Sequence, residues 1–96
     1  MLSEIPKGYG KVREESTVKS DAELLRIGLI AELDAVNLYE QLAHLARDEK
    51  VKKLFLEIAR EEKTHVGEFL TMLKEKDEEL VKELEAGEKE VEELSK

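Results

Sequence analysis

The chain has 96 residues, 42% of them charged, and a formal net charge of -8. A chain of this length forms one small domain with a modest core. The acidic balance argues against binding to nucleic acid and against docking on an anionic membrane. Because the sequence has no cysteine, disulfides, thiolate zinc sites and iron–sulfur clusters are excluded, and any metal must be held by oxygen and imidazole. Neither a signal peptide nor a membrane-spanning stretch is present, so we expect a cytoplasmic protein.

Residues 1–19 are predicted to form an extended N-terminal arm. Pro6, Gly8 and Gly10 interrupt this segment, and its apolar residues follow no helical period. We therefore expect it to lie outside the helical part of the chain.

Residues 20–75 are predicted to form an antiparallel helical hairpin. Ser20 and Glu23 have the spacing of a capping box, which marks the start of a helix that continues to about Ala46. A second helix is predicted from about Glu49 to Lys74. Each helix carries a row of apolar residues that recurs at helical spacing. The rows are Leu25, Leu29, Glu32, Val36, Tyr39, Ala43 and Ala46 on the first helix, and Val51, Phe55, Ile58, Glu62, His65, Phe69 and Met72 on the second.

Residues 76–96 are predicted to form an acidic, amphipathic C-terminal helix whose start is capped by Asp77. Leu80, Leu84, Val91 and Leu94 follow a heptad-like seam on an otherwise charged helix. The predicted fold class is therefore all-α, with a two-helix hairpin, a third helix and a ferritin-like four-helix bundle that is completed by dimerisation.

Three polar side chains interrupt the apolar rows of the hairpin. Glu32 stands in the first row, and Glu62 and His65 stand one turn apart in the second. A charge in an apolar row needs a partner, because an unpaired buried charge is very costly. Glu32 and His65 each lie about 16 residues from the turn, or about 25 Å at 1.5 Å per residue. We therefore predict that the three side chains meet and bind a metal ion.

This set of residues is half of the ligand set of a di-iron carboxylate centre. Such a centre takes a Glu from each of two helices of a bundle and a Glu-x-x-His from each of the other two. One chain supplies two Glu, one His and two helices, so a two-fold homodimer would complete both the ligands and the bundle. These ligands suit Fe(II) that reacts with oxygen, and other divalent metals can substitute.

Each polar residue near the rows also has a purely structural interpretation. A Glu-x-x-His pair on a surface helix is common without a metal. Tyr39 is either a core tyrosine or a hydrogen-bond partner of a ligating carboxylate. Asp34 is either a solvated charge or a group that attracts cations toward the site. His44 lies beside the rows near the turn, and we interpret it as a surface residue.

Two blocks of the sequence resemble the encapsulated ferritins, which are short ferritin-like proteins housed inside encapsulin shells. The blocks are Glu32–Tyr39 and Arg60–His65, and the spacing between them also matches that family. The resemblance covers about residues 20–75. It implies a ferroxidase centre between two subunits and an open ring of dimers, typically a decamer.

The resemblance also assigns roles to individual residues. It carries the iron ligands over to Glu32, Glu62 and His65, and a tyrosine that supports the ligands to Tyr39. In some members an acidic pair outside the site attracts metal, and of that pair this chain keeps only Asp34.

The encapsulated ferritins reach their shell through a C-terminal targeting peptide or through direct fusion to the shell protein. No such peptide is recognisable after Val91, so we expect the chain to be the ferritin-like part of a fusion and to lie inside an encapsulin nanocompartment.

The predicted function is oxidation of Fe(II) to Fe(III) with oxygen, for iron storage. A rubrerythrin-like or catalase-like peroxidase would use the same ligands, although the chain lacks the cysteines of a self-sufficient rubrerythrin. The other alternative is a helical interaction module without metal, which requires Glu32 and Glu62 to pair with Lys or Arg. Their rows contain no such residue.

Overall fold

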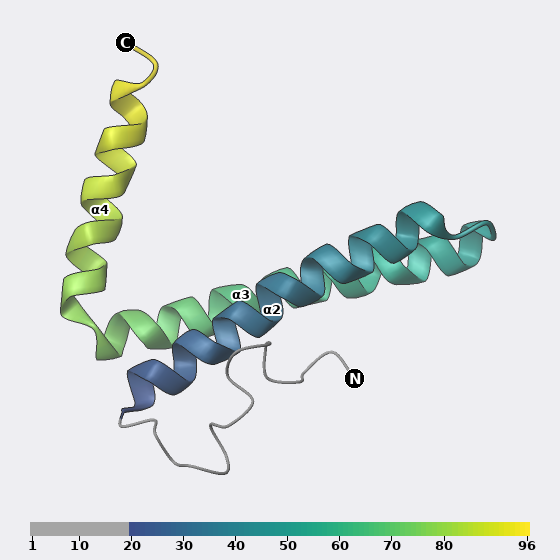
Figure 1. The fold of residues 1–96 in the computed structure, drawn as a ribbon, viewed down its shortest axis with the longest axis horizontal. Coiled ribbons are helices and arrows are strands. Elements are labelled where there is room, and N and C mark those ends of the chain that lie inside the picture. The colour runs from purple at the N-terminus through teal and green to yellow at the C-terminus, as the bar shows by residue number, and fades with distance from the viewer. Residues whose placement is uncertain (1–19) are drawn as a thin grey trace.

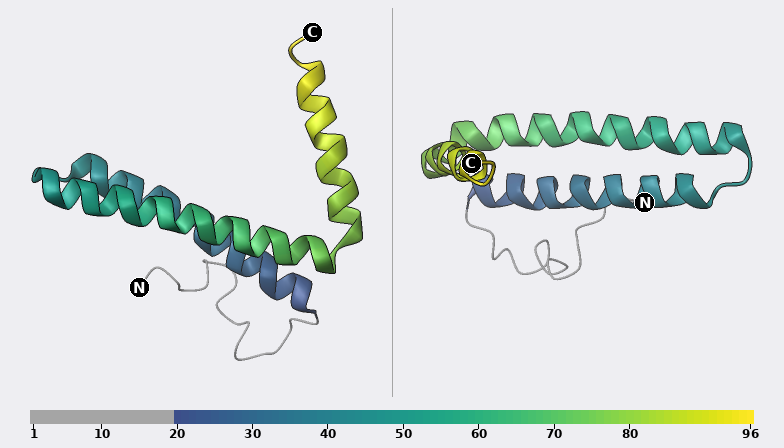
Figure 2. Two further views of the ribbon diagram at one scale, coloured as in Figure 1. Left: turned by 180° about the vertical axis from the view of Figure 1, so that it is seen from behind. Right: turned by 90° about the horizontal axis from the view of Figure 1, so that it is seen from above.

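A computed structural model of the chain describes residues 20–96, which form three helices. α2 spans Asp21–Leu45, α3 spans Glu49–Lys76 and α4 spans Glu78–Glu93. α2 and α3 lie side by side as an antiparallel hairpin, whereas α4 leaves the hairpin at a steep angle (Figure 1; Figure 2). The all-α prediction is confirmed. The arm predicted for residues 1–19 lies outside the described residues.

Each helix begins at a residue whose side-chain oxygen accepts a hydrogen bond from the backbone N–H three positions later. Ser20, Asp48 and Asp77 play this part for α2, α3 and α4, at 3.2, 2.9 and 2.9 Å. A cap of this kind stabilises a helix by about 1 kcal/mol. The caps predicted at Ser20 and Asp77 are therefore confirmed.

The end of α3 is the largest difference from the predicted helix boundaries. α2 ends at Leu45, one residue before the predicted end, but α3 continues to Lys76, past the predicted end at Lys74. The basic side chains of Lys74 and Lys76 stabilise the negative end of the helix dipole, which favours the extra half turn. α3 then ends, and Asp77 forms the N-cap of α4.

The hairpin buries little apolar surface. Its buried residues within 20–96 are Ala35, Val36, Ala43, Ala59 and Leu73. Because three of these five are alanines, the helices approach closely but remove few large side chains from water. Many large apolar side chains remain exposed. They are Leu24, Ile30, Leu33, Leu45, Val51, Leu54, Leu56, Met72, Leu84, Val91 and Leu94. A single copy of this hairpin thus forms only part of a core.

Asp77 joins the corner between α3 and α4 to the start of α2. Its Oδ1 caps α4, and its Oδ2 lies 3.4 Å from Nη1 of Arg26 on α2. Beyond this corner α4 stands clear of the hairpin, and Val91 exposes 66% of its surface. None of the helices in residues 20–96 has the length and the apolar run that spanning a bilayer requires.

Candidate metal centre

The structure brings Glu32, Glu62 and His65 together between α2 and α3. His65 Nδ1 lies 3.4 Å from Glu32 Oε2 and 3.7 Å from Glu62 Oε2. One possible ligand atom from each of the three residues lies within 4.8 Å of the other two. The predicted meeting of these side chains at one depth of the hairpin is therefore confirmed, and their role as ligands stays a prediction.

The two carboxylates are largely shielded from water, whereas the imidazole is open to it. Glu32 and Glu62 expose 18% and 19% of their side chains, and His65 exposes 45%. The Oε2 atom of Glu32 is buried and has no hydrogen-bond partner within residues 20–96. Leaving such an atom unsatisfied costs about 1 to 3 kcal/mol. His65 Nδ1 lies 3.4 Å from this atom, and a bound cation would satisfy the Glu32 carboxylate.

The electrostatics of the cluster favour a cation. Burial raises the pKa of the Glu32 carboxyl, and the neighbouring Glu62 raises it further, while His65 offsets only part of this effect. Desolvation lowers the pKa of His65, but the Glu32 and Glu62 carboxylates outweigh it and raise that pKa overall. When His65 is neutral, two carboxylates face each other without a compensating charge. A positive ion among them would relieve this repulsion.

The donor set fits a divalent transition metal. Two ligands that each lie about 2.1 Å from one ion are about 3 to 4 Å apart, so the spacing of these three side chains requires only small movements. Two carboxylates and one imidazole also leave open coordination positions, as expected where a substrate must reach the metal. Glu32, Glu62 and His65 would hold the ion, with the unpartnered oxygen of Glu32 as one ligand atom.

The ion pairs that lysine and arginine make in the hairpin lie outside this cluster. Lys63 on α3 pairs with Glu40 on α2 at 3.1 Å, and Arg60 pairs with Glu57 on its own helix. Within residues 20–96, neither Glu32 nor Glu62 pairs with a lysine or an arginine. This counts against a helical interaction module without metal, which required such pairs.

The remaining residues singled out from the sequence lie around the cluster rather than in it. The Tyr39 ring packs against Phe55, with ring centroids 6.1 Å apart. Its hydroxyl makes no hydrogen bond within the described residues, so a supporting role for Tyr39 stays a prediction. Asp34 is exposed and is not one of the three clustered residues. His44 is exposed, as predicted.

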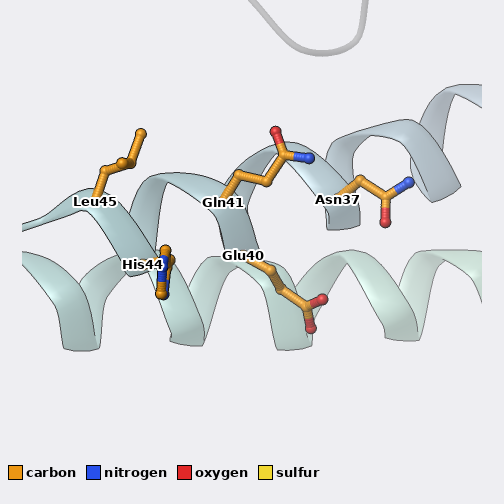
Figure 3. Close-up of a pocket in the computed structure, with 5 residues that line it drawn as sticks. All are labelled: Asn37, Glu40, Gln41, His44 and Leu45. Atoms are coloured by element: carbon orange, nitrogen blue, oxygen red, sulfur yellow. The ribbon is translucent and has the colours of Figure 1, made fainter.

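A surface pocket lies on the part of α2 nearer the turn. Its lining residues are Asn37, Glu40, Gln41, His44 and Leu45. Figure 3 shows that they all project from α2, with Gln41 pointing away from α3. Since Glu40 is already paired with Lys63, this pocket offers no set of free ligands comparable to the cluster.

Comparison with known proteins places the chain in a family. Residues 23–96 match the Rubrerythrin family. The structure resembles the crystal structure of the encapsulated ferritin domain from Pyrococcus furiosus with a TM-score of 0.75 and 47% identity, covering 84% of this chain and 91% of that one. The chain belongs to the Rubrerythrin family and to the encapsulated ferritins. The resemblance seen in the sequence is therefore confirmed.

This encapsulated ferritin is also similar to part of a longer protein. It is 56% identical over 73 residues to the ferritin-like–encapsulin shell fusion protein of Pyrococcus furiosus. That match covers 76% of this chain and 21% of the relative, so the chain spans about a fifth of the length of that fusion protein.

Proposed function

We propose that two copies of this chain oxidise Fe(II) to Fe(III) with oxygen at a di-iron centre formed between them. The observation that carries the proposal is the cluster of Glu32, Glu62 and His65, in which a buried carboxylate oxygen has no hydrogen-bond partner within residues 20–96. Iron is the substrate. Each of two Fe(II) ions gives up one electron, and oxygen takes both electrons with two protons and leaves as hydrogen peroxide.

The ligand count supports a centre made from two chains. Two copies of the cluster supply four carboxylates and two imidazoles, the set that holds two iron ions in bundles of this type. His65 must be neutral to bind iron, so metal binding releases the proton that its raised pKa would otherwise retain. The carboxylates then offset the charge of the two ions.

The exposed apolar surface of the hairpin supports the same assembly. Residues that face the other helix recur at alternating steps of three and four. On both helices, the residue that precedes a facing residue in the sequence lies on the same side of the hairpin. This follows because antiparallel helices are related by an approximate two-fold axis. We call this the apolar side. It comprises Leu24, Ala31, Leu38, Leu42 and Leu45 of α2, and Val51, Leu54, Ile58, His65 and Met72 of α3, together with the acidic Glu61 and Glu68. Gly28 and Ala35 belong to the same row of α2 but are covered within the hairpin.

Burial of the apolar side against a second copy is more favourable than its exposure to water. Leu45 and Leu54 expose 75% and 57% of their surfaces there. His65 belongs to this side and exposes 45% of its side chain, so a partner seated on it would meet the open face of the metal cluster. The opposite side carries the Lys63–Glu40 ion pair, with Leu33 and Leu56 exposed beside it, and its apolar row is interrupted by charged residues. A two-fold contact through the apolar side therefore joins both copies of the cluster.

The shell protein fused to the Pyrococcus furiosus relative supports a role in iron storage. We propose that the chain acts inside an encapsulin shell, joined to it by fusion, and that its dimers form a decameric ring. An open ring has no closed cavity, so the shell would hold the oxidised iron.

The test of the site is oxygen-dependent Fe(II) oxidation by the wild type and by Glu32→Ala, Glu62→Ala and His65→Ala. Each substitution removes a ligand, so each should slow oxidation by at least about tenfold. Comparing oxygen with hydrogen peroxide as oxidant separates a ferroxidase from a peroxidase. Undiminished oxidation in all three variants would contradict the assignment, and faster turnover with peroxide would favour the peroxidase.

The test of the dimer uses two leucines that lie two positions apart on α3. Leu54 is on the apolar side and Leu56 on the opposite side, with 57% and 49% of their surfaces exposed. Leu54→Lys should abolish both the dimer and iron oxidation, whereas Leu56→Lys should preserve both. Sedimentation and oxidation assays on both variants give the answer. Dimers and full activity in Leu54→Lys would refute the apolar side as the interface.

A further inference from the structure

One turn from the metal cluster, the ring of Phe69 lies directly against the backbone of α2 at Gly28. A Cβ added to Gly28 would lie 2.4 Å from Cε1 and 2.7 Å from Cζ of the Phe69 ring. Real Cβ atoms do not approach other atoms so closely, so the ring occupies the space that any other residue would need. At Gly67 and Gly87, an added Cβ would meet nothing within 4 Å. Among the glycines of residues 20–96, only Gly28 is thus required by a tertiary contact.

This contact has a fixed place relative to the proposed ligands. Gly28 precedes Glu32 by four residues on α2, and Phe69 follows His65 by four residues on α3. Four residues are about one turn, or about 6 Å of helix rise. Side chains of a helix lean toward its N-terminus, so Glu32 leans toward the level of Gly28 and Phe69 leans toward the level of His65. The contact therefore adjoins the metal cluster on both helices.

The separation of the helices at this point decides whether one ion can be reached from both. Glu32 comes from α2, and Glu62 and His65 come from α3, with their ligand atoms within 4.8 Å of one another. Ligand distances to one transition-metal ion must hold to about 0.2 Å. A shift of about 1 Å between the helices would therefore leave the ion too far from one set of ligands. A Cβ at Gly28 would have to displace either the end of the Phe69 ring or the α2 backbone, and a ring that keeps its rotamer acts as a spacer between the two helices.

We propose that Gly28 and Phe69 are positioning residues that set the separation of α2 and α3 at the metal centre. This inference rests on the proposed function, since it assumes that Glu32, Glu62 and His65 bind one ion. Neither Gly28 nor Phe69 contacts the ion. Their part is to hold the two helices at the distance at which the three ligands converge.

The proposal makes a prediction about how two substitutions combine. Gly28→Ala adds a Cβ under the ring and pushes the helices apart, whereas Phe69→Leu removes ring atoms and lets them settle closer. Each alone should weaken Co²⁺ binding by about tenfold to a hundredfold, the range typical of residues that support metal ligands. In the double variant the added Cβ fills the space that the ring vacates. It should therefore bind Co²⁺ more tightly than either single variant.

The experiment is a Co²⁺ titration followed by the visible absorption of the bound ion, on the full chain, with unfolding temperatures measured in parallel. Gly67→Ala is the matched control, because it makes the same change in α3 where there is free space, and its Co²⁺ affinity should equal that of the wild type. A purely structural contact would change the unfolding temperature and leave the absorption band of the bound ion unaltered. A positioning contact changes the band itself.

The outcomes separate the inference from the proposed function. The positioning role would be overturned if Gly28→Ala binds Co²⁺ with the affinity of the wild type. It would also be overturned if the losses of Co²⁺ affinity in the two single variants add up in the double variant. Either result leaves the metal centre standing. If Gly28→Ala does not fold, the comparison of Phe69→Leu with the double variant decides, since only a spacer predicts tighter binding in the latter. A wild-type protein that binds no Co²⁺ would overturn both the centre and the positioning role.

Discussion

Replacing Glu32 with glutamine should stabilise the metal-free protein at high pH and at the same time abolish iron oxidation. In the metal-free state the Glu32 carboxylate is shielded, lies next to Glu62 and has one oxygen without a hydrogen-bond partner in the described part of the chain. Glutamine has nearly the same shape and no charge, so it removes the repulsion. It also removes a ligand, so stability and function should change in opposite directions, as is common at functional sites.

The sign of this effect depends on pH. The pKa values of both Glu32 and His65 are raised in the folded chain. Each group therefore contributes stability that is fully present below its unfolded pKa and is lost as the pH rises through its folded pKa. Between the two transitions, protonated His65 pairs with ionised Glu32, which favours the wild type. Above the raised pKa of His65 this pair is gone and two carboxylates face each other, so the wild type loses stability.

The expected size of the effect follows from this buried polar atom, because the amide N–H of glutamine can donate to the neighbouring Glu62 carboxylate, whereas the Glu32 carboxylate has no proton to donate at high pH. An unsatisfied buried polar atom costs about 1 to 3 kcal/mol. Because Glu32 keeps 18% of its side chain exposed, we take the lower end, about 1 kcal/mol, which raises the unfolding temperature by about 4 to 8 °C for a chain of this size. Near pH 6, below the raised pKa of His65, the imidazolium still lies beside the two carboxyl groups, so Glu32→Gln should give a smaller gain or none.

The assay is thermal unfolding of chelator-treated protein near pH 6 and near pH 9, followed by circular dichroism at one protein concentration, because subunit association also contributes to the apparent stability. Glu75→Gln is the matched control, since it removes one exposed carboxylate from the same hairpin outside the apolar side. It should change the unfolding temperature little, and equally at both pH values. A Glu32→Gln variant that gains nothing near pH 9, or gains as much near pH 6, would refute the reasoning.

Three further predictions concern the surroundings of the site. Asp77→Ala should lower the free energy of unfolding in urea by about 1 kcal/mol, because α4 loses its cap. Asp77→Asn and Arg26→Ala lose only an exposed ion pair, so each should lower it by less than about 0.5 kcal/mol. Equal losses from Asp77→Ala and Asp77→Asn would contradict the capping role. Gly67→Ala and Gly87→Ala should each stabilise the protein by about 0.5 to 1 kcal/mol, because both lie in helices with free space, and a loss of stability in either would show an unforeseen contact. Tyr39→Phe keeps the packing on Phe55, so slower iron oxidation at an unchanged unfolding temperature would assign the hydroxyl to the support of a ligand, and an unchanged rate would assign Tyr39 to the core.

The apolar rows were sufficient to predict the hairpin and the meeting of its polar residues. Helical spacing placed Glu32, Glu62 and His65 in the apolar rows of the two helices. The short turn fixed their depth, because both helices rise by the same amount per residue. These two regularities hold for any straight antiparallel pair, so a prediction from sequence was possible.

Other features depend on contacts that helical periodicity does not specify. Gly28 stood in an apolar row as a small residue that allows close approach, but nothing in its spacing indicated that the Phe69 ring would fill that space. The steep departure of α4 depends on the backbone at Asp77 and on its pairing with Arg26. The buried oxygen of Glu32 likewise follows from the local separation of two helices. Each requires coordinates across the hairpin.

The central claim is that one chain holds half of the metal ligands and that a second copy supplies the rest. The most direct test is an Fe(II) titration without oxygen, followed by sedimentation that separates the oligomers by mass. Iron is then measured in each species of known mass. We expect one iron per chain, carried only by species with an even number of chains, and oxidation of that iron when oxygen is admitted. A monomer that binds two iron ions and oxidises them would contradict it.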